Sequence, residues 1–212
     1  MKILVTGFEP FGGETENPSA QVARRLPASL AGAEIVTAIL PVTCRGALET
    51  VTEAIRHHRP DAVLSLGQAG GRAAVSIERI AINVDDFSIP DNEGAQPKDQ
   101  AIVPGGPAAY WSTLPIRAME AAVRAAGVPC QISNTAGTYV CNHVMYGVAH
   151  LLGREFPGTV SGFLHIPYLP EQVLDKPGQP SMPLELSRQA VEAALTAIAG
   201  CNAATPTGAT GG

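Results

Sequence analysis

The sequence predicts a single α/β domain of three layers, α/β/α, with an open, mostly parallel twisted sheet at its centre. Short apolar runs alternate with segments of helical period, and glycine or proline separates them. The apolar residues are mostly aliphatic, with 5% aromatics, which suits buried parallel strands under Ala-rich helices. A chain of 212 residues holds one sizeable core, which we expect over residues 1–200. The tail, residues 201–212, has no apolar period and is expected to be disordered.

In the first half of the chain, apolar runs predict strands. Pro18 stands where the first turn of a helix would begin, and it predicts a helix start. We expect strands at 3–6, 34–40, 61–66 and 75–84, and helices from about 18 and over 46–59. Residues 94–107 carry glycine, proline and polar residues without an apolar period. This segment is therefore expected to be an ordered loop or flap rather than a domain linker.

The second half of the chain repeats the alternation. We expect helices over 116–126, 139–156 and 184–199, and strands at 130–133 and 161–166. In such an open sheet, sites form beyond the carboxyl ends of the strands. Residues at the ends of strands and at the starts of the following helices are therefore the candidates for chemistry.

Composition limits the classes of partner. A net charge of −5 gives no reason to expect nucleic acid or an anionic membrane, so we expect a small or peptidic ligand. The apolar start of the chain ends at Gly7, too early for a signal-peptide core or a membrane span. We therefore expect a cytoplasmic protein with four reduced thiols and no CxxC pair: Cys44, Cys130, Cys141 and Cys201.

Cys141 lies in the segment SNTAGTYVCNH, which joins a strand to a helix. The expected buried stripe of that helix, Val144, Val148 and Leu151, places Cys141 in its first turn. Unpaired amides and the helix dipole favour a thiolate there, so we expect the thiol pKa to fall towards neutrality. A small buried structural cysteine remains the alternative interpretation.

His165 is one of the last residues of its strand before Pro167, which places it at the carboxyl edge of the sheet. The alternative is a histidine that bonds a backbone carbonyl at a strand end. His143 and His150, in the same helix as Cys141, make less convincing partners for that thiol.

Glu78 stands in an apolar strand segment, where alternation sends it to the side of Ile80 and Ile82. Arg79 points to the opposite face, so a histidine or positioned amides must satisfy a buried Glu78 carboxylate. A glutamate that reaches solvent at the strand end is the alternative. A cysteine, a histidine and a carboxylate from three segments suit a nucleophile, its base and the residue that orients the base.

At these residues the chain resembles the pyroglutamyl peptidase I family, also called pyrrolidone-carboxylate peptidases, from about Lys2 to Glu171. The segments that carry the resemblance are TGFEPFGGETENPS, GQAGGR, ERIAIN, IPDNEGAQP, GGPAAYW, TAGTYVCNH and HIPYLPEQ. The resemblance implies a cysteine peptidase that removes an N-terminal pyroglutamyl residue without a metal or cofactor, often as a homotetramer. It also implies that Cys141, His165 and Glu78 fill the catalytic positions.

The resemblance further implies a pocket for a five-membered lactam, with five residues carried over by position: Phe8, Phe11, Gln68, Ile89 and Tyr139. A site that bonds the lactam would reject proline, which lacks the ring carbonyl, and Gln68 is the best candidate for this discrimination. One departure is Ser88, which stands where similar family members commonly have an arginine. If that arginine assists the oxyanion, turnover here would be weak unless a neighbour such as Arg72 substitutes.

Other readings stay open. A nucleoside phosphorylase-like transferase would use the Gly-rich stretch 67–71 and Arg72 to hold an anion, although this stretch is not a P-loop. A non-catalytic protein that binds pyroglutamyl peptides is motivated by Ser88. A structural zinc site of Cys141, His143 and His165 is less favoured, because it lacks closely spaced ligand pairs and a fourth ligand.

Overall fold

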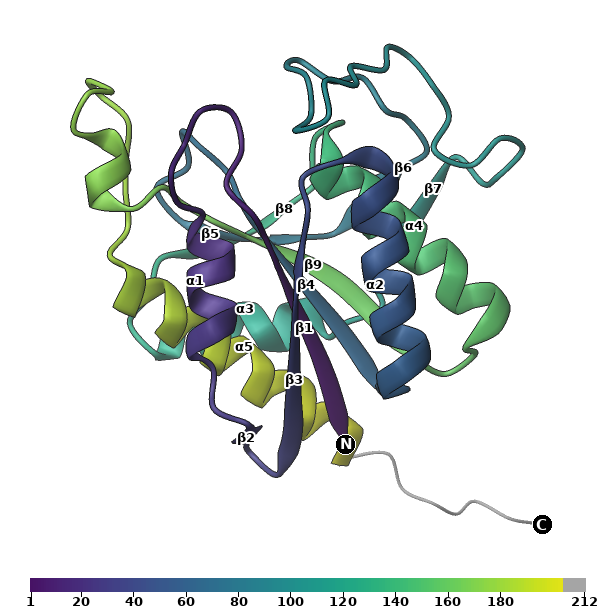
Figure 1. Cartoon of the computed structure of the whole chain (residues 1–212). Helices are drawn as coiled ribbons and strands as arrows, with labels where there is room; N and C mark the ends of the chain where they lie inside the picture. Colours follow the sequence, from purple (N-terminus) through teal and green to yellow (C-terminus); the bar gives the residue numbers. More distant parts are fainter. Residues whose placement is uncertain (204–212) are drawn as a thin grey trace.

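A seven-stranded sheet runs through the computed structural model, which describes residues 1–203 (Figure 1). The order across the sheet is β2-β3-β1-β4-β9-β5-β8. The strands are β1 Lys2–Phe8, β2 Ser29–Leu30, β3 Ala33–Leu40, β4 Ala62–Gln68, β5 Val75–Glu78, β8 Cys130–Ser133 and β9 Val160–Ile166. Two further strands, β6 Ile80–Ile82 and β7 Ala109–Trp111, pair with each other in a separate small sheet.

The central strands β3, β1, β4 and β9 are all parallel, and β5 is parallel to β8. Strand β5 is antiparallel to β9, and the short β2 is antiparallel to β3. The predicted mostly parallel sheet is therefore confirmed, with antiparallel pairing at two junctions.

Helices cover both faces of the sheet, which confirms the three-layer prediction (Figure 1). One face carries α2 Cys44–His58 and α4 Val140–Glu155, and the other carries α1 Pro18–Arg25, α3 Ile116–Ala125 and α5 Leu184–Ala203. Alternation along β1 feeds both cores, because Ile3 and Val5 pack towards α1 and α5 while Leu4 packs towards α2 and α4. A short 3₁₀ turn, η1 Pro170–Val173, follows β9.

The single strand predicted over 75–84 is wrong, because the chain divides at Arg79. Residues before the break pair with β8 and β9, whereas those after it pair with β7. Glu78 is fully buried, while Ile82 is 37% exposed, so the two residues do not share one buried face. The predicted burial of Glu78 is therefore correct, but the reason given for it, alternation along a single strand with Ile80 and Ile82, is wrong.

The C-terminal helix is longer than predicted. Helix α5 continues to Ala203, so the expected disordered tail does not begin at Cys201, which is helical and exposed. The rest of that predicted tail, residues 204–212, lies outside the described residues. Within residues 1–203, no helix is both long enough and apolar enough to cross a membrane.

The segment 94–107 holds no helix or strand, as predicted, and hydrogen bonds tie it to the preceding residues. The Gln100 amide donates to the Asp85 carbonyl, and the Asp85 amide donates to the Gln100 carbonyl. The carbonyl of Pro97 accepts from the Phe87 amide.

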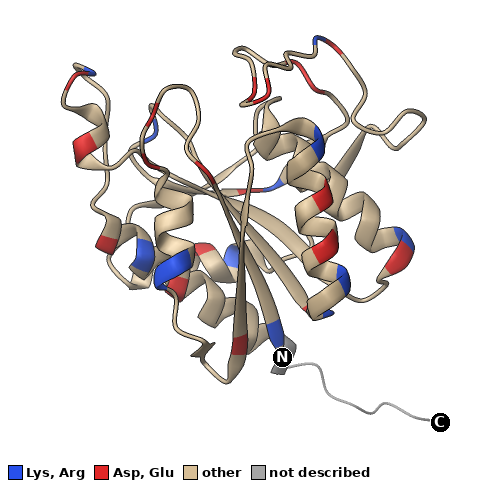
Figure 2. Ribbon diagram, in the orientation of Figure 1, with Lys and Arg blue, Asp and Glu red and all other residues tan. Residues whose placement is uncertain are grey.

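On the outer surface of α2, basic and acidic residues are interspersed (Figure 2), as in the Arg45–Glu49 ion pair.

Candidate active site

The site forms at the carboxyl ends of β4 and β9, where helix α4 begins. Gly67 of β4 and His165 of β9 are register partners in parallel strands, so substituents on these two residues would point to the same face. A Cβ placed on Gly67 would lie 2.9 Å from the Cys141 sulfur and 2.8 Å from the Phe163 ring. The sulfur therefore sits against the bare backbone of Gly67, on the face of the sheet that carries the His165 imidazole.

Helix α4 holds Cys141 in its first turn, as predicted, after the N-cap residue Tyr139. The next residue, Asn142, is fully buried and fastens this turn to the segment after β5. Its Oδ1 accepts from the Ile82 amide at 3.0 Å, and its Nδ2 donates to the carbonyls of Ile82 and Val84 at 2.9 and 3.0 Å. The position of the sulfur is thus fixed by a side-chain amide that the sequence did not single out.

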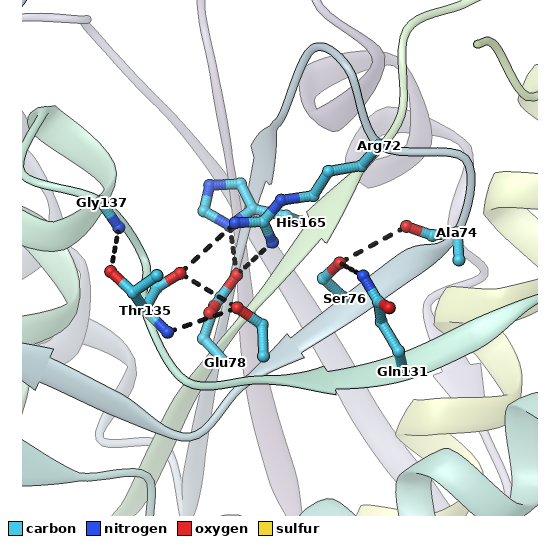
Figure 3. Close-up of polar contacts among 9 residues, drawn as sticks. Arg72, Ala74, Ser76, Glu78, Gln131, Thr135, Gly137 and His165 are labelled. Atoms are coloured by element: carbon cyan, nitrogen blue, oxygen red, sulfur yellow. Dashed lines mark hydrogen bonds and ion pairs between the residues drawn. The ribbon is translucent and has the colours of Figure 1, made fainter.

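His165 and Arg72 both bond one oxygen of the buried Glu78 carboxylate (Figure 3). His165 Nδ1 lies 2.8 Å from Glu78 Oε1, and Arg72 Nη1 donates to the same oxygen at 2.6 Å. Burial opposes ionisation of Glu78 most strongly, yet the hydrogen bond and charge of His165, the Ser133 hydroxyl and Arg72 together lower its pKa. Glu78 is therefore an ionised carboxylate that orients the imidazole.

Sequence analysis considered Arg72 as a substitute for the arginine replaced by Ser88 and, in the transferase alternative, as a residue that holds an anion, but not as a partner of Glu78. Its guanidinium also donates to the Thr135 carbonyl at 3.3 Å, so it links Glu78 to the segment that leads into α4 (Figure 3). No periodic signal could reveal this role, because Arg72 lies in the glycine-rich loop between β4 and β5. Ser88 is exposed, and its backbone carbonyl accepts from Gln96 Nε2 at 3.0 Å.

The expected fall in the pKa of Cys141 is wrong for this structure. Burial and the neighbouring Glu78 carboxylate raise the pKa of the thiol to about 12, although Arg72 and the Cys141 backbone amide act in the opposite direction. The helix terminus is outweighed because the sulfur is packed against β4 and faces an anion. Both effects favour the protonated thiol, so a base must take its proton when it reacts.

A narrow pocket opens beside the Cys141 sulfur and contains four of the five predicted substrate residues. It is lined by Phe8, Phe11, Asn17, Val42, Gln68, Tyr139, Val140 and Cys141. The ring centroids of Phe11 and Tyr139 lie 5.8 Å apart, so the walls are aromatic. The fifth predicted residue, Ile89, is not among these lining residues; it is 39% exposed and faces Gly12.

Gln68 is held in place by Gln172, whose role the sequence did not indicate. Gln172 Nε2 donates to Gln68 Oε1 at 2.9 Å, and Gln172 Oε1 accepts from the Leu169 amide. Among the described residues no hydrogen bond involves Gln68 Nε2, which leaves this donor for a ligand. Apolar rings and one such donor suit a small ring that carries an amide carbonyl, but the pocket has a volume of only about 10 Å³, so its walls must move apart to admit such a ring.

The other histidines of α4 have partners of their own. His143 Nδ1 lies 2.8 Å from Asp85 Oδ2, and His150 Nδ1 lies 2.9 Å from the Tyr110 hydroxyl. Neither forms a bond with Cys141, as expected from the sequence.

Comparisons with known proteins agree with this geometry. The family model described as pyroglutamyl peptidase matches residues 1–200. A pyrrolidone-carboxylate peptidase of Levilactobacillus brevis is 54% identical over 198 residues, covering 93% of this chain and 97% of the relative. One from Finegoldia magna is 50% identical over the same length, covering 93% of each chain.

Solved structures agree as well. Pyroglutamyl peptidase I of Bacillus amyloliquefaciens superposes with a TM-score of 0.91 at 44% identity, covering 94% of this chain and 97% of that one. A mutant pyrrolidone carboxyl peptidase of Pyrococcus furiosus gives 0.90 at 44% identity, covering 93% and 98%. These matches favour a peptidase over a nucleoside phosphorylase-like transferase or a non-catalytic binding protein. The chain belongs to the pyroglutamyl peptidase family, a family of cysteine-type omega peptidases.

Proposed function

We propose that this family member removes an N-terminal pyroglutamyl residue from peptides with Cys141 as nucleophile, His165 as base and Glu78 as the residue that orients His165. The observation that carries the assignment is the bond from His165 Nδ1 to a fully buried Glu78, next to the Cys141 sulfur at Gly67. With Nδ1 bonded to the carboxylate, Nε2 is the nitrogen left for proton transfer.

In the proposed reaction, the sulfur attacks the pyroglutamyl carbonyl as His165 takes the thiol proton. Backbone amides of the first turn of α4, including that of Cys141, stabilise the oxyanion. His165 then gives the proton to the departing amine, which leaves a thioester. A water molecule, deprotonated by His165, hydrolyses the thioester and regenerates the thiol. The steps use only groups of this chain and a water molecule, and no cofactor is required.

The substrate ring would occupy the pocket of Phe8, Phe11, Gln68 and Tyr139. Pyroglutamate carries no charged amine, so aromatic walls cover its ring without leaving a buried ion unpaired. The free Nε2 of Gln68 would donate to the lactam carbonyl, which proline lacks. Ile89 would lie at the rim of the pocket, near Gly12, rather than against the ring.

We also infer one catalytic domain over residues 1–200, a cytoplasmic location and a homotetramer, as the family resemblance implies. Exposed apolar side chains support the assembly, because Trp111 is 65% and Leu174 is 81% exposed to solvent in the single chain. Sedimentation of the full chain would measure the number of copies.

The test is hydrolysis of a chromogenic pyroglutamyl amide by wild type and Cys141→Ala. We expect the variant to lose at least about 1,000-fold in kcat, because no nucleophile replaces the thiol. In a Cys201→Ala background, which lacks the exposed thiol, iodoacetamide should inactivate the enzyme and label the peptide that contains Cys141. The matched control is Cys201→Ala, which removes an exposed thiol of α5 and should keep full activity. Retained activity in Cys141→Ala would disprove the assignment.

A further inference from the structure

A second cluster of reactive side chains lies close to the active site, between the starts of α2 and α4. Cys44 is the first residue of α2, His143 follows Cys141 in α4, and Asp85 lies after β6. One ligand atom from each of the three side chains lies within 4.8 Å of the others. His143 Nδ1 and Asp85 Oδ2 are already 2.8 Å apart.

The Asp85 carboxylate is buried and only half satisfied. Asp85 is 5% exposed, and its Oδ1 has no hydrogen-bond partner among the described residues. A buried carboxylate oxygen without a partner is unfavourable, because it has lost its bonds to water. Glu78, the comparable acid of the active site, also has one such oxygen, Oε2, but its other oxygen bonds Arg72 as well as His165. Within residues 1–203 no lysine or arginine forms an ion pair with Asp85.

A second carboxylate adds to the negative charge around Cys44. Asp91 Oδ2 accepts from the Cys44 amide at 3.0 Å, and its Oδ1 accepts from the amides of Glu93 and Ala95. Burial raises the pKa of the Cys44 thiol to about 12, with Asp85 and Asp91 contributing in the same direction. Two carboxylates and a thiol therefore share a partly enclosed place, and within residues 1–203 neither carboxylate forms an ion pair with a lysine or arginine.

We propose that Cys44, Asp85 and His143 form a binding site for one divalent transition-metal ion of the zinc type. Sulfur, imidazole and carboxylate together suit Zn²⁺ or Co²⁺ and disfavour Mg²⁺ or Ca²⁺, which prefer oxygen ligands. This site differs in every residue from the catalytic constellation, and it does not depend on the proposed peptidase mechanism.

The cluster supplies three protein ligands and leaves a fourth position open. Cys44 and His143 both line a groove of about 550 Å³ along α2, which would supply a water molecule or a small anion as the fourth ligand. Zinc bonds of about 2.3 Å to sulfur and about 2.0 Å to nitrogen require only small side-chain movements from the present spacing. On binding, the thiol releases its proton to solvent as the metal–sulfur bond forms, and the double positive charge offsets Asp85.

The structural consequence would be a clamp on the start of α4. The metal ion would join α2, α4 and the segment after β6, at a point two residues beyond Cys141. Binding to the folded chain alone raises its stability by mass action. We therefore expect Zn²⁺ to raise the unfolding temperature of the protein.

The experiment uses Co²⁺ as a spectroscopic probe in the full chain, reduced and freed of metal, on a Cys141→Ser background. That background removes the active-site thiol, which could otherwise supply a thiolate. We expect one Co²⁺ per chain, a near-ultraviolet sulfur-to-cobalt charge-transfer band and visible bands of a four-coordinate ion. Zn²⁺ should displace the Co²⁺.

Adding Cys44→Ser should abolish the charge-transfer band and weaken Co²⁺ binding by at least about 10-fold, since a direct ligand matters at least as much as an outer-shell group. It should also remove the rise in unfolding temperature with Zn²⁺. The matched control is Cys201→Ser on the same background, which should keep the band. Absence of the band on the Cys141→Ser background, or its survival in Cys44→Ser, would overturn the proposal whether or not the enzyme is active.

Discussion

Two regions of this molecule contain nearly the same arrangement of side chains. In one, His165 bonds Glu78 at 2.8 Å beside Cys141; in the other, His143 bonds Asp85 at 2.8 Å near Cys44. Both carboxylates are buried, and burial raises the pKa of both thiols to about 12. A cysteine near a bonded pair of histidine and acid therefore does not by itself identify an active site.

The surroundings distinguish the two regions. The Glu78 carboxylate has a second, cationic partner in Arg72, and the Cys141 sulfur opens onto a pocket with aromatic walls. Each acid has one oxygen without a partner among the described residues, Glu78 Oε2 and Asp85 Oδ1, but the Asp85 carboxylate has no cationic partner like Arg72, and its cluster opens onto a groove along α2. The proposed active site thus has an arginine beside its acid, whereas among the described residues no lysine or arginine pairs with Asp85.

Exchange of the two histidines for asparagine tests this distinction most strongly. The Asn amide can replace Nδ1 in the bond to the acid, but it supplies no equivalent of Nε2. We expect His165→Asn to lower kcat by about 1,000-fold or more, because the base is lost. His143→Asn should have a far smaller effect, since its ring does not contact the pocket. Steady-state kinetics with circular dichroism on both variants measures this, and equal losses in two folded variants would refute the distinction.

Substitution of the glycines beside each cysteine should have the next largest effect. Gly67→Ala would place a methyl group 2.9 Å from the Cys141 sulfur, and a displacement near 1 Å can lower turnover by about 100-fold. Gly46→Ala would instead approach the Thr43 hydroxyl at 2.6 Å, at the start of α2. We expect a clear loss of kcat only in the first variant. Similar kcat in both would show that the sulfur adapts without loss of reactivity.

Removal of the cation from the active site should have a smaller effect. Arg72→Gln weakens one hydrogen bond to an ionised acid, a change of about 1.5–3 kcal/mol, or about 10- to 100-fold in kcat/KM. Since Arg72 helps to lower the pKa of Glu78, its loss should move the acidic limb of the pH profile to higher pH. Arg72→Lys should restore part of the activity.

The control for Arg72 is Arg79→Gln. Arg79 is the next arginine along the chain. Its Nε donates to Asn134 Oδ1 at 2.8 Å, and it does not bond Glu78. Its loss should leave the pH profile in place. An unchanged profile in Arg72→Gln would show that Arg72 supports the fold without tuning the acid.

Much of this architecture could be predicted from sequence because it depends on local pattern. Aliphatic runs followed by glycine located the strands, and the end of β9 and the start of α4 placed His165 and Cys141 at one edge of the sheet. The catalytic roles of Cys141, His165 and Glu78 stay predictions. The lactam pocket came from resemblance, and the structure gathers four of its five predicted residues around Cys141.

What failed depends on contacts between distant segments. The break at Arg79 follows from a change of partner strand, which alternation along one segment cannot show. The direction of the pKa shift of Cys141 depends on how closely Gly67 and Glu78 approach the sulfur. Asp85 and His143 are 58 residues apart in the sequence, and neither their spacing nor a motif predicts that they form a bonded pair.

Alkaline unfolding provides the finest comparison of the two thiols. Each is raised from an ordinary pKa of about 8.5 to about 12, so folding favours the protonated form. That contribution is complete below the unfolded pKa and is lost as pH rises towards the folded pKa, by at most about 1.4 kcal/mol per pH unit. We therefore expect the free energy of unfolding of wild type to fall between pH 8.5 and 10.5 more steeply than that of Cys141→Ala or Cys44→Ala.

Denaturant titrations at several pH values measure these slopes, with Cys201→Ala as the exposed control that should behave as wild type. Similar changes of slope in Cys141→Ala and Cys44→Ala would mean that both thiols rest in the protonated form. The difference between the regions would then lie in their acids and cations rather than in their sulfurs. If only Cys44→Ala changed the slope, Cys141 would already be a thiolate paired with a protonated His165 in the resting enzyme. His165 would then act first as the acid towards the leaving amine, and the proton transfer proposed for the attack would be unnecessary.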